Sequence, residues 1–182
     1  MKERLRCSDI ASCSSGKIFF DTNIILSLFT SLTVRQNANE YSKFFGECVK
    51  LNKALYIDTH VLSEFVNAYL RFEYKKYLKS HKIDSTKCSF KDYRGRQEGI
   101  DAMNAAEAVV KNRLLKKFTL AGKQFCCADI SSFSFVGADF NDLIITEICK
   151  EHDLVLATDD GDFLNADISV ISENSAYHPT TA

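Results

Sequence analysis

Short apolar runs alternate along the chain with longer stretches in which apolar residues recur every three or four positions. The short runs have the length of β-strands and lie at residues 17–20, 54–57, 125–130, 154–157 and 168–171. Their apolar residues do not alternate regularly with polar ones. We therefore expect strands that are buried on both faces, as in a parallel sheet.

Apolar stretches with helical spacing separate these strands. They predict helices at residues 24–29, 39–51, 61–72, 96–117 and 139–151. Residues 80–96 are polar and break the pattern, which indicates a loop or an insertion. Strands that alternate with helices predict an α/β protein, here a three-layer α/β/α sandwich with a central, mainly parallel sheet.

The length of 182 residues suits one ordinary domain that carries an insertion. We expect residues 1–16 to be a polar N-terminal leader and residues 173–182 to be a C-terminal tail. The domain then spans residues 17–172. Its insertion, around residues 73–98, is basic and is expected to contain helix and loop.

Composition excludes several classes of protein. With 46% hydrophobic and 26% charged residues, the chain is globular and not disordered. No apolar run approaches the roughly 20 residues that cross a bilayer, so we expect no membrane partner. Seven cysteines form no CxxC pair and have no histidine at zinc-finger spacing, which favours free thiols and a cytoplasmic protein.

Acidic residues stand where predicted strands end. Asp21 follows the strand at residues 17–20, and Asp159 and Asp160 follow the strand at residues 154–157. Asp142 lies in the first turn of the last predicted helix, and Glu64 flanks the apolar face of another helix. Because ligands of parallel α/β sheets bind beyond the carboxyl ends of the strands, we expect acids from these segments to lie together.

Converging carboxylates repel one another, and a pair of charges at ~4 Å costs about 4 kcal/mol at an effective dielectric constant near 20. Protons or a cation must neutralise such a cluster. Oxygen ligands without histidine or cysteine select Mg²⁺ or Mn²⁺, which can activate water and stabilise a leaving alkoxide. The cluster therefore predicts hydrolysis of phosphodiester bonds.

Each acid also has a purely structural interpretation. Asp21 can cap the following helix, and Asp139 with Asp142 can form a capping pair. Glu64 can be a solvated helix residue, and residues 159–162 can be an ordinary turn. These alternatives stay open at the level of the sequence.

The order and spacing of these residues resemble the PIN-domain ribonucleases, the family that includes VapC-type toxins. The matching pieces are residues 19–23 (FFDTN), 63–64 (SE), 141–144 (NDLI) and 156–163 (LATDDGDF). The resemblance covers residues 17 to about 163. It implies a PIN-like fold and a metal-dependent endoribonuclease that leaves a 5′-phosphate and a 3′-hydroxyl.

The resemblance also implies roles for individual residues. Asp21, Glu64, Asp142 and Asp160 correspond to a catalytic acidic quartet that holds one or two Mg²⁺ or Mn²⁺ ions. Asp162 corresponds to a further metal ligand, and Asn23 and Thr158 to residues that support the site. The implied partners are an RNA substrate and an antitoxin protein, with a homodimer as a further candidate assembly.

Charge is distributed unevenly although the net charge is only −1. Residues 71–96 contain nine bases and three acids (+6), whereas residues 124–182 contain one base and eleven acids (−10). Aromatic residues are interleaved with the bases, as in surfaces that bind single-stranded RNA. The alternative is a solvated segment whose aromatic residues pack internally. The candidate RNA-binding residues are Arg71, Lys75, Lys76, Lys79, Arg94 and Arg96.

Two other functions are compatible with parts of the pattern. A haloacid-dehalogenase-like phosphatase also begins with an Asp at a strand end, but it requires a second Asp where this chain has Asn23. A catalytically silent PIN-fold module that binds RNA or serves as a scaffold is the second alternative, and an intact quartet argues against it. A calcium-binding loop at Asp160 is excluded, because Asn165 and Ile171 occupy the positions that need Gly and Glu.

Overall fold

The computed structural model describes residues 2–30 and 37–179. Its centre is one six-stranded sheet in which all strands run parallel, in the order β1-β6-β5-β2-β3-β4. The strands are β1 (Arg4–Leu5), β2 (Lys17–Phe20), β3 (Ala54–Ile57), β4 (Thr119–Leu120), β5 (Val155–Ala157) and β6 (Val170–Ile171). The fold is therefore α/β, as the sequence predicted.

The central strands are apolar because both faces are covered. Ile18, Phe19 and Phe20 of β2 are fully buried, as are Leu156 and Ala157 of β5. The register pairs Phe20 with Ala157, so β2 and β5 end side by side at the same edge of the sheet. This pairing brings the residues that follow the two strands together.

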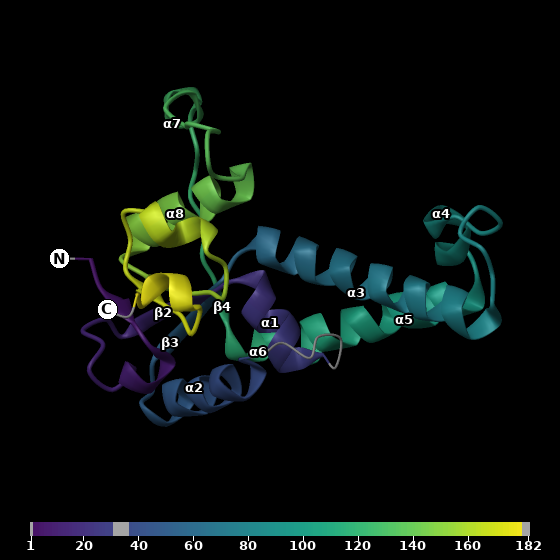
Figure 1. Ribbon diagram of the computed structural model, residues 1–182, viewed down its shortest axis with the longest axis horizontal. Coiled ribbons are helices and arrows are strands. Elements are labelled where there is room, and N and C mark those ends of the chain that lie inside the picture. Colours follow the sequence, from purple (N-terminus) through teal and green to yellow (C-terminus); the bar gives the residue numbers. More distant parts are fainter. Residues whose placement is uncertain (1, 31–36, 180–182) are drawn as a thin grey trace.

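Helices pack on both sides of the sheet, consistent with a three-layer α/β/α sandwich, and α2 and α8 lie on opposite sides of the strands (Figure 1). Right-handed crossovers between parallel strands require this arrangement, since the chain moves in opposite directions along the sheet before and after β4. The helices are α1 (Thr22–Phe29), α2 (Ala38–Lys50), α3 (Thr59–His81), α4 (Phe90–Arg94), α5 (Gln97–Val109), α6 (Leu115–Lys117), α7 (Cys127–Ser131) and α8 (Phe140–His152).

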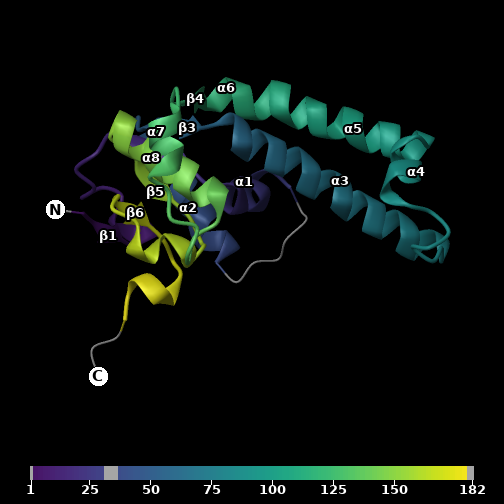
Figure 2. The same cartoon turned by 90° about the horizontal axis from the view of Figure 1, so that it is seen from above.

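A helical arm projects from this sandwich. Figure 2 shows α3 and α5 running side by side away from the sheet, with α4 at the far end. A π-helical turn, Val110–Leu114, connects α5 to α6. The arm has its own small core of Tyr77, Cys88 and Tyr93, separate from the core around the sheet. The predicted insertion is thus the outer part of a helical hairpin.

Both predicted terminal segments belong to the domain. Arg4 and Leu5 form edge strand β1 beside β6, and Cys7, Ile10 and Cys13 are buried. The prediction of a separate leader was wrong because a two-residue strand and three scattered apolar side chains leave no recognisable pattern. In the tail, Tyr177 is buried at 5% exposure. Met1 and residues 180–182 of the two predicted segments lie outside the described residues.

Residues 125–130 do not form the predicted strand. Cys126 precedes the short helix α7, and its backbone N–H donates to the Asp129 carboxylate (2.8 Å) in a capping box. Cys126 and Cys127 are exposed, and the strand at this edge of the sheet is β4, a few residues earlier. Polar capping at Asp129 therefore outweighed the apolar run.

Two further expectations concern the chain as a whole. All seven cysteines lie within the described residues and are free thiols, as predicted. In the described part of the chain, no helix is long and apolar enough to span a membrane.

Candidate active site

Asp21 is held at the end of β2 by hydrogen bonds to both carboxylate oxygens. Its Oδ1 accepts from the backbone N–H of Thr22 (2.6 Å), the cap of α1. Its Oδ2 accepts from the side-chain amide of Asn23 (2.6 Å) and from the hydroxyl of Thr158 (2.7 Å). Asp21 is only 7% exposed. The residue thus caps the helix and also presents a fixed carboxylate at the strand edge.

Thr158 joins the ends of β2 and β5. Besides donating to Asp21, its Oγ1 accepts from the backbone N–H of Asp160 (3.0 Å) and from Asn23 Nδ2 (3.2 Å). Asn23 completes the link, because its Oδ1 accepts from the backbone N–H of Asp159 (3.2 Å). Thr158 and Asn23 therefore position the acids that follow both strands.

The residues after β5 form a turn in which successive acids face different ways. Asp160 and Asp162 line the same pocket as Asp21, and Asp160 Oδ1 accepts from the backbone N–H of Asp162 (3.1 Å). Asp159 Oδ1 instead accepts from the hydroxyl of Tyr41 (2.8 Å). The hydroxyl of Tyr177 donates to the carbonyl of Asp160 (2.5 Å) and fixes the turn from outside.

Glu64 reaches the pocket from the second turn of α3. Its Oε2 accepts from the hydroxyl of Thr22 (2.7 Å), and its Oε1 accepts from the side-chain amide of Asn141 (2.6 Å). These donors come from α1 and α8, so three elements meet at this carboxylate. Glu64 is half-buried and is not the solvated helix residue of the structural alternative.

Thr22 and Asn141 are functional candidates that the sequence did not single out. Each stands one residue away from an acid of the predicted quartet, which is the signal that could have identified them. Their role arises only from tertiary structure, because they lie 42 and 77 residues from Glu64.

Asp142 enters from the first turn of α8. Its Oδ2 accepts from the backbone N–H of Asp139 (3.3 Å) within a capping box, so the predicted capping pair exists. Both side chains also line the pocket with Asp21, Glu64 and Asp160. Capping and membership of the acidic site therefore occur together.

The resulting pocket has a volume of about 260 Å³, and Asp139, Asp160 and Asp162 of its lining are exposed to solvent. We call it the acidic pocket. It is lined by Asp21, Thr22, Asn23, Leu26, Glu64, Asp139, Asn141, Asp142, Asp160 and Asp162. All four acids of the predicted quartet and the predicted fifth acid are among them, whereas Thr158 lies behind Asp21. Asp58, which follows β3, is excluded and caps α3 through Val61 (2.7 Å).

Burial and mutual repulsion raise the pKa of two carboxyls in the acidic pocket. Burial, followed by the charges of Asp160 and Glu64, raises the pKa of Asp21 to about 7, against hydrogen bonds that lower it. Burial also raises the pKa of Asp142 to about 6, with contributions from the charges of Asp160 and Asp162. The pocket is therefore short of positive charge at neutral pH.

The chemistry of the lining fits a hard divalent cation. Its charged groups are all carboxylates, and its neutral polar groups are amides and a hydroxyl. Within residues 2–30 and 37–179, however, no three acidic, histidine or cysteine side chains are grouped closely enough to hold one ion. The carboxylates thus share a pocket without forming a preassembled cage.

The candidate RNA-binding residues lie on the helical arm and not in the acidic pocket. Lys75 and Lys79 are exposed on α3, as is Lys76, which pairs with Glu73 (3.4 Å). Arg71 lies over the ring of Phe90 (5.1 Å to the ring centroid). Arg94 and Arg96 are exposed at the far end, and Arg96 donates to the hydroxyl of Tyr77 (3.3 Å).

Most of the interleaved aromatic residues of the arm pack internally. Tyr77 and Tyr93 are 7% and 2% exposed, with ring centroids 5.2 Å apart. Tyr74 packs against Phe90 at 5.5 Å and against Tyr93 at the same distance. These four rings are buried or half-buried and are not placed to stack on nucleotide bases, whereas Phe72 is 37% exposed. The basic arm therefore offers charge without a continuous aromatic platform.

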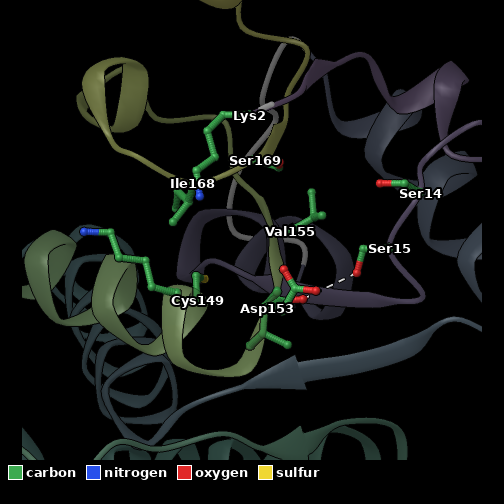
Figure 3. A pocket seen from close by; sticks show the side chains of 10 residues that line it. Lys2, Ser14, Ser15, Cys149, Asp153, Val155, Ile168 and Ser169 are labelled. Atoms are coloured by element: carbon green, nitrogen blue, oxygen red, sulfur yellow. Dashed lines mark hydrogen bonds between the residues drawn. The ribbon is translucent and has the colours of Figure 1, made fainter.

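A second pocket, of about 350 Å³, lies near the amino end of β5 and is shown in Figure 3. Its lining includes Lys2, Ser15, Cys149, Asp153 and Ser169, and the Ser15 hydroxyl donates to the carbonyl of Asp153 (3.5 Å). None of the site residues predicted from the sequence lines it. The predicted acidic residues lie at the opposite edge of the sheet, beyond the carboxyl ends of β2 and β5.

Comparisons with models of known protein families and with curated proteins found no match for this chain.

Proposed function

We propose that this protein is a Mg²⁺- or Mn²⁺-dependent endoribonuclease of PIN type that hydrolyses phosphodiester bonds of RNA. One observation carries the proposal: Asp21, Glu64, Asp142 and Asp160, from four distant parts of the chain, line a single pocket at the carboxyl ends of β2 and β5. Helix capping accounts for Asp21 and Asp142 but not for the convergence of all four acids, which their mutual repulsion opposes.

The residues of the pocket have distinct roles in the proposed reaction. A bound divalent ion would polarise an oxygen of the scissile phosphate and lower the pKa of a bound water molecule. Asp21, Glu64, Asp142 and Asp160 would hold one or two such ions, with Asp162 as a further ligand at the open side. Thr158 and Asn23 would fix Asp21, and Thr22 and Asn141 would fix Glu64.

The phosphatase alternative is less well supported by the same contacts. That reaction needs Asp21 as a nucleophile with an acid two residues later. Asn23 stands there and donates a hydrogen bond to Asp21, and Thr22 and Thr158 donate to the same carboxylate. A carboxylate that accepts three hydrogen bonds is better suited to a fixed ligand than to a nucleophile.

The resemblance to VapC-type proteins extends the proposal to a cytoplasmic toxin that is controlled by an antitoxin. This extension rests on the sequence motifs alone. A toxin should arrest growth when it is expressed by itself, and the Asp160→Asn variant should not.

Cleavage of labelled RNA tests the proposed activity. The neighbouring acids Asp160 and Asp159 provide a matched pair, because one lines the pocket and the other faces Tyr41. With Mn²⁺, we expect Asp160→Asn to lower kcat/KM by about 10³-fold, which corresponds to several kcal/mol of transition-state stabilisation. Asp159→Asn should retain most activity, and EDTA should abolish it. Equal activity of the two variants would refute the assignment.

A further inference from the structure

Helix α3 connects the acidic pocket to the basic arm in one continuous element. Glu64 lies near its beginning, and Arg71, Lys75 and Lys79 follow at intervals of seven, four and four residues. At 100° per residue, these three bases point within about 60° of the direction of Glu64. A row of positive charges therefore follows Glu64 along one side of α3, from Arg71, about two turns beyond it, to Lys79. Figure 2 shows that this part of α3 runs outward from the sheet.

The members of this row, which we call the α3 stripe, are accessible. Arg71, Lys75 and Lys79 are exposed. Neither Lys75 nor Lys79 forms an ion pair within the part of the chain that the structure describes. Arg71 is held over the Phe90 ring, which fixes the position of its charge. Among the described residues, no carboxylate forms an ion pair with a member of the stripe.

Two other bases of the arm lack these properties. Lys76 pairs with Glu73 at 3.4 Å and points about 120° away from the direction of Glu64. Arg96 is not on α3: it is the N-cap residue of α5 and donates to the hydroxyl of Tyr77. Geometry thus separates the stripe from these two bases.

We propose that the α3 stripe binds the phosphate backbone of the same RNA strand that is cleaved in the acidic pocket, and that α3 therefore sets a minimum substrate length. This inference rests on the proposed function. A row of cations suits a polyanion with regularly spaced charges. Because Tyr77 and Tyr93 are buried, the contact should depend on phosphate charge more than on base sequence. The substrate class is an extended RNA and not a short oligonucleotide.

The length of α3 beyond Glu64 gives the minimum length of the RNA substrate. Lys79 lies 15 residues after Glu64, which corresponds to about 22 Å along the helix axis. At about 3.4 Å per stacked nucleotide, this distance equals six or seven nucleotides on one side of the cleaved bond. Longer RNA should gain nothing further from the stripe.

Binding without cleavage tests the stripe independently of the nuclease activity. Fluorescence anisotropy with a 20-nucleotide RNA in EDTA would compare the wild type with the double variant Lys75→Ala/Lys79→Ala at several salt concentrations. Two lost phosphate contacts should weaken binding about tenfold near 0.1 M salt and reduce the slope of log K against log[salt] by about 1.4. Lys76→Ala is the matched control, and thermal midpoints should be equal for all three proteins.

Cleavage in Mn²⁺ tests the length requirement. An RNA with a mapped cleavage site would be shortened stepwise from each end. In the wild type, kcat/KM should rise with length on one side and level off at about seven nucleotides, and the double variant should lose this rise. In one outcome, the wild type cleaves no RNA while the double variant still shows the expected decrease in the slope of log K against log[salt]. That result would contradict the proposed nuclease activity but not the binding of RNA by the stripe. An unchanged slope and unchanged affinity in the double variant would overturn the stripe and favour an acidic protein as its partner.

Discussion

The acidic pocket and the helical arm both include residues of α3, yet their charged residues differ in sign and in exposure. In the pocket, charges of one sign converge from distant parts of the chain. The more buried of them accept hydrogen bonds from donors far away in the sequence, as Asp21 does from Thr158 and Glu64 does from Thr22 and Asn141. On the arm, charges of the other sign are exposed, and Lys75 and Lys79 point away from a small core of tyrosines.

The difference predicts where stability and function are coupled. A substitution in the acidic pocket changes repulsion and buried hydrogen bonds, so it should alter both the free energy of unfolding and the chemistry. A substitution of an exposed lysine on the arm should alter RNA binding while changing the free energy of unfolding by no more than about 0.5 kcal/mol. The predictions below test this contrast, beginning with the largest expected effect.

The largest effect concerns the dependence of stability on pH without metal. Asp21 has a pKa near 7 in the folded protein, and the unfolded chain restores the usual value near 3.8. Between these values the folded state binds more protons, so ionisation of Asp21 destabilises the protein as pH rises from about 4 to 7. The contribution reaches about 4 kcal/mol.

Because other groups also titrate in this range, the measured quantity is the difference in unfolding free energy between the wild type and a variant without Asp21. Unfolding by urea in EDTA, for the wild type and for Asp21→Asn, gives two free energies at each pH. Their difference should shift in favour of the variant as pH rises from 4 to 7 and should remain constant above pH 8. A difference that does not vary with pH would show that Asp21 ionises normally and that the pocket is not electrostatically strained.

A smaller effect is expected at Thr158, which links the ends of β2 and β5. Thr158→Val removes the hydroxyl that donates to Asp21 and accepts from the N–H of Asp160. Loss of these buried hydrogen bonds should lower the free energy of unfolding by about 2 kcal/mol. Cleavage should fall at least tenfold, because both acids lose an anchor.

Thr158→Ser is the matched control, since it keeps the hydroxyl and removes only the methyl group. It should recover most of the cleavage and most of the stability. If the serine variant is as inactive as the valine variant, packing and not hydrogen bonding determines the effect, and the linking role of Thr158 is wrong.

Much of the fold could be predicted because the signals are local. Residues 17–20 and 54–57 form strands with the predicted bounds, since a short apolar run buried on both faces has few alternatives. Parallel strands also end at one edge, which explains why Asp21 and Asp160 could be predicted to meet. The location of Glu64 in the pocket could be predicted from its position beside the apolar face of α3.

The features that could not be predicted depend on tertiary contacts. Strand β1 has two residues and exists only because β6 lies beside it. The tyrosines of the arm alternate with bases in the sequence, and only the pairing of α3 with α4 and α5 shows that Tyr77 and Tyr93 face inward. Thr22 and Asn141 stand beside predicted acids, but their pairing with Glu64 could not be inferred, because no local pattern connects α1, α3 and α8.

Binding of Mn²⁺ tests the central claim most directly, because it requires neither a substrate nor a cleavage site. Titration at pH 8, followed by the electron paramagnetic resonance signal of free Mn²⁺, would compare the wild type with Asp142→Asn and with Asp167→Asn, an acid outside the acidic pocket whose side chain is 76% exposed. We expect the wild type and Asp167→Asn to bind one or two ions with equal affinity, and Asp142→Asn to bind at least about tenfold more weakly. Equal affinity of all three proteins, or no binding by any of them, would contradict the account.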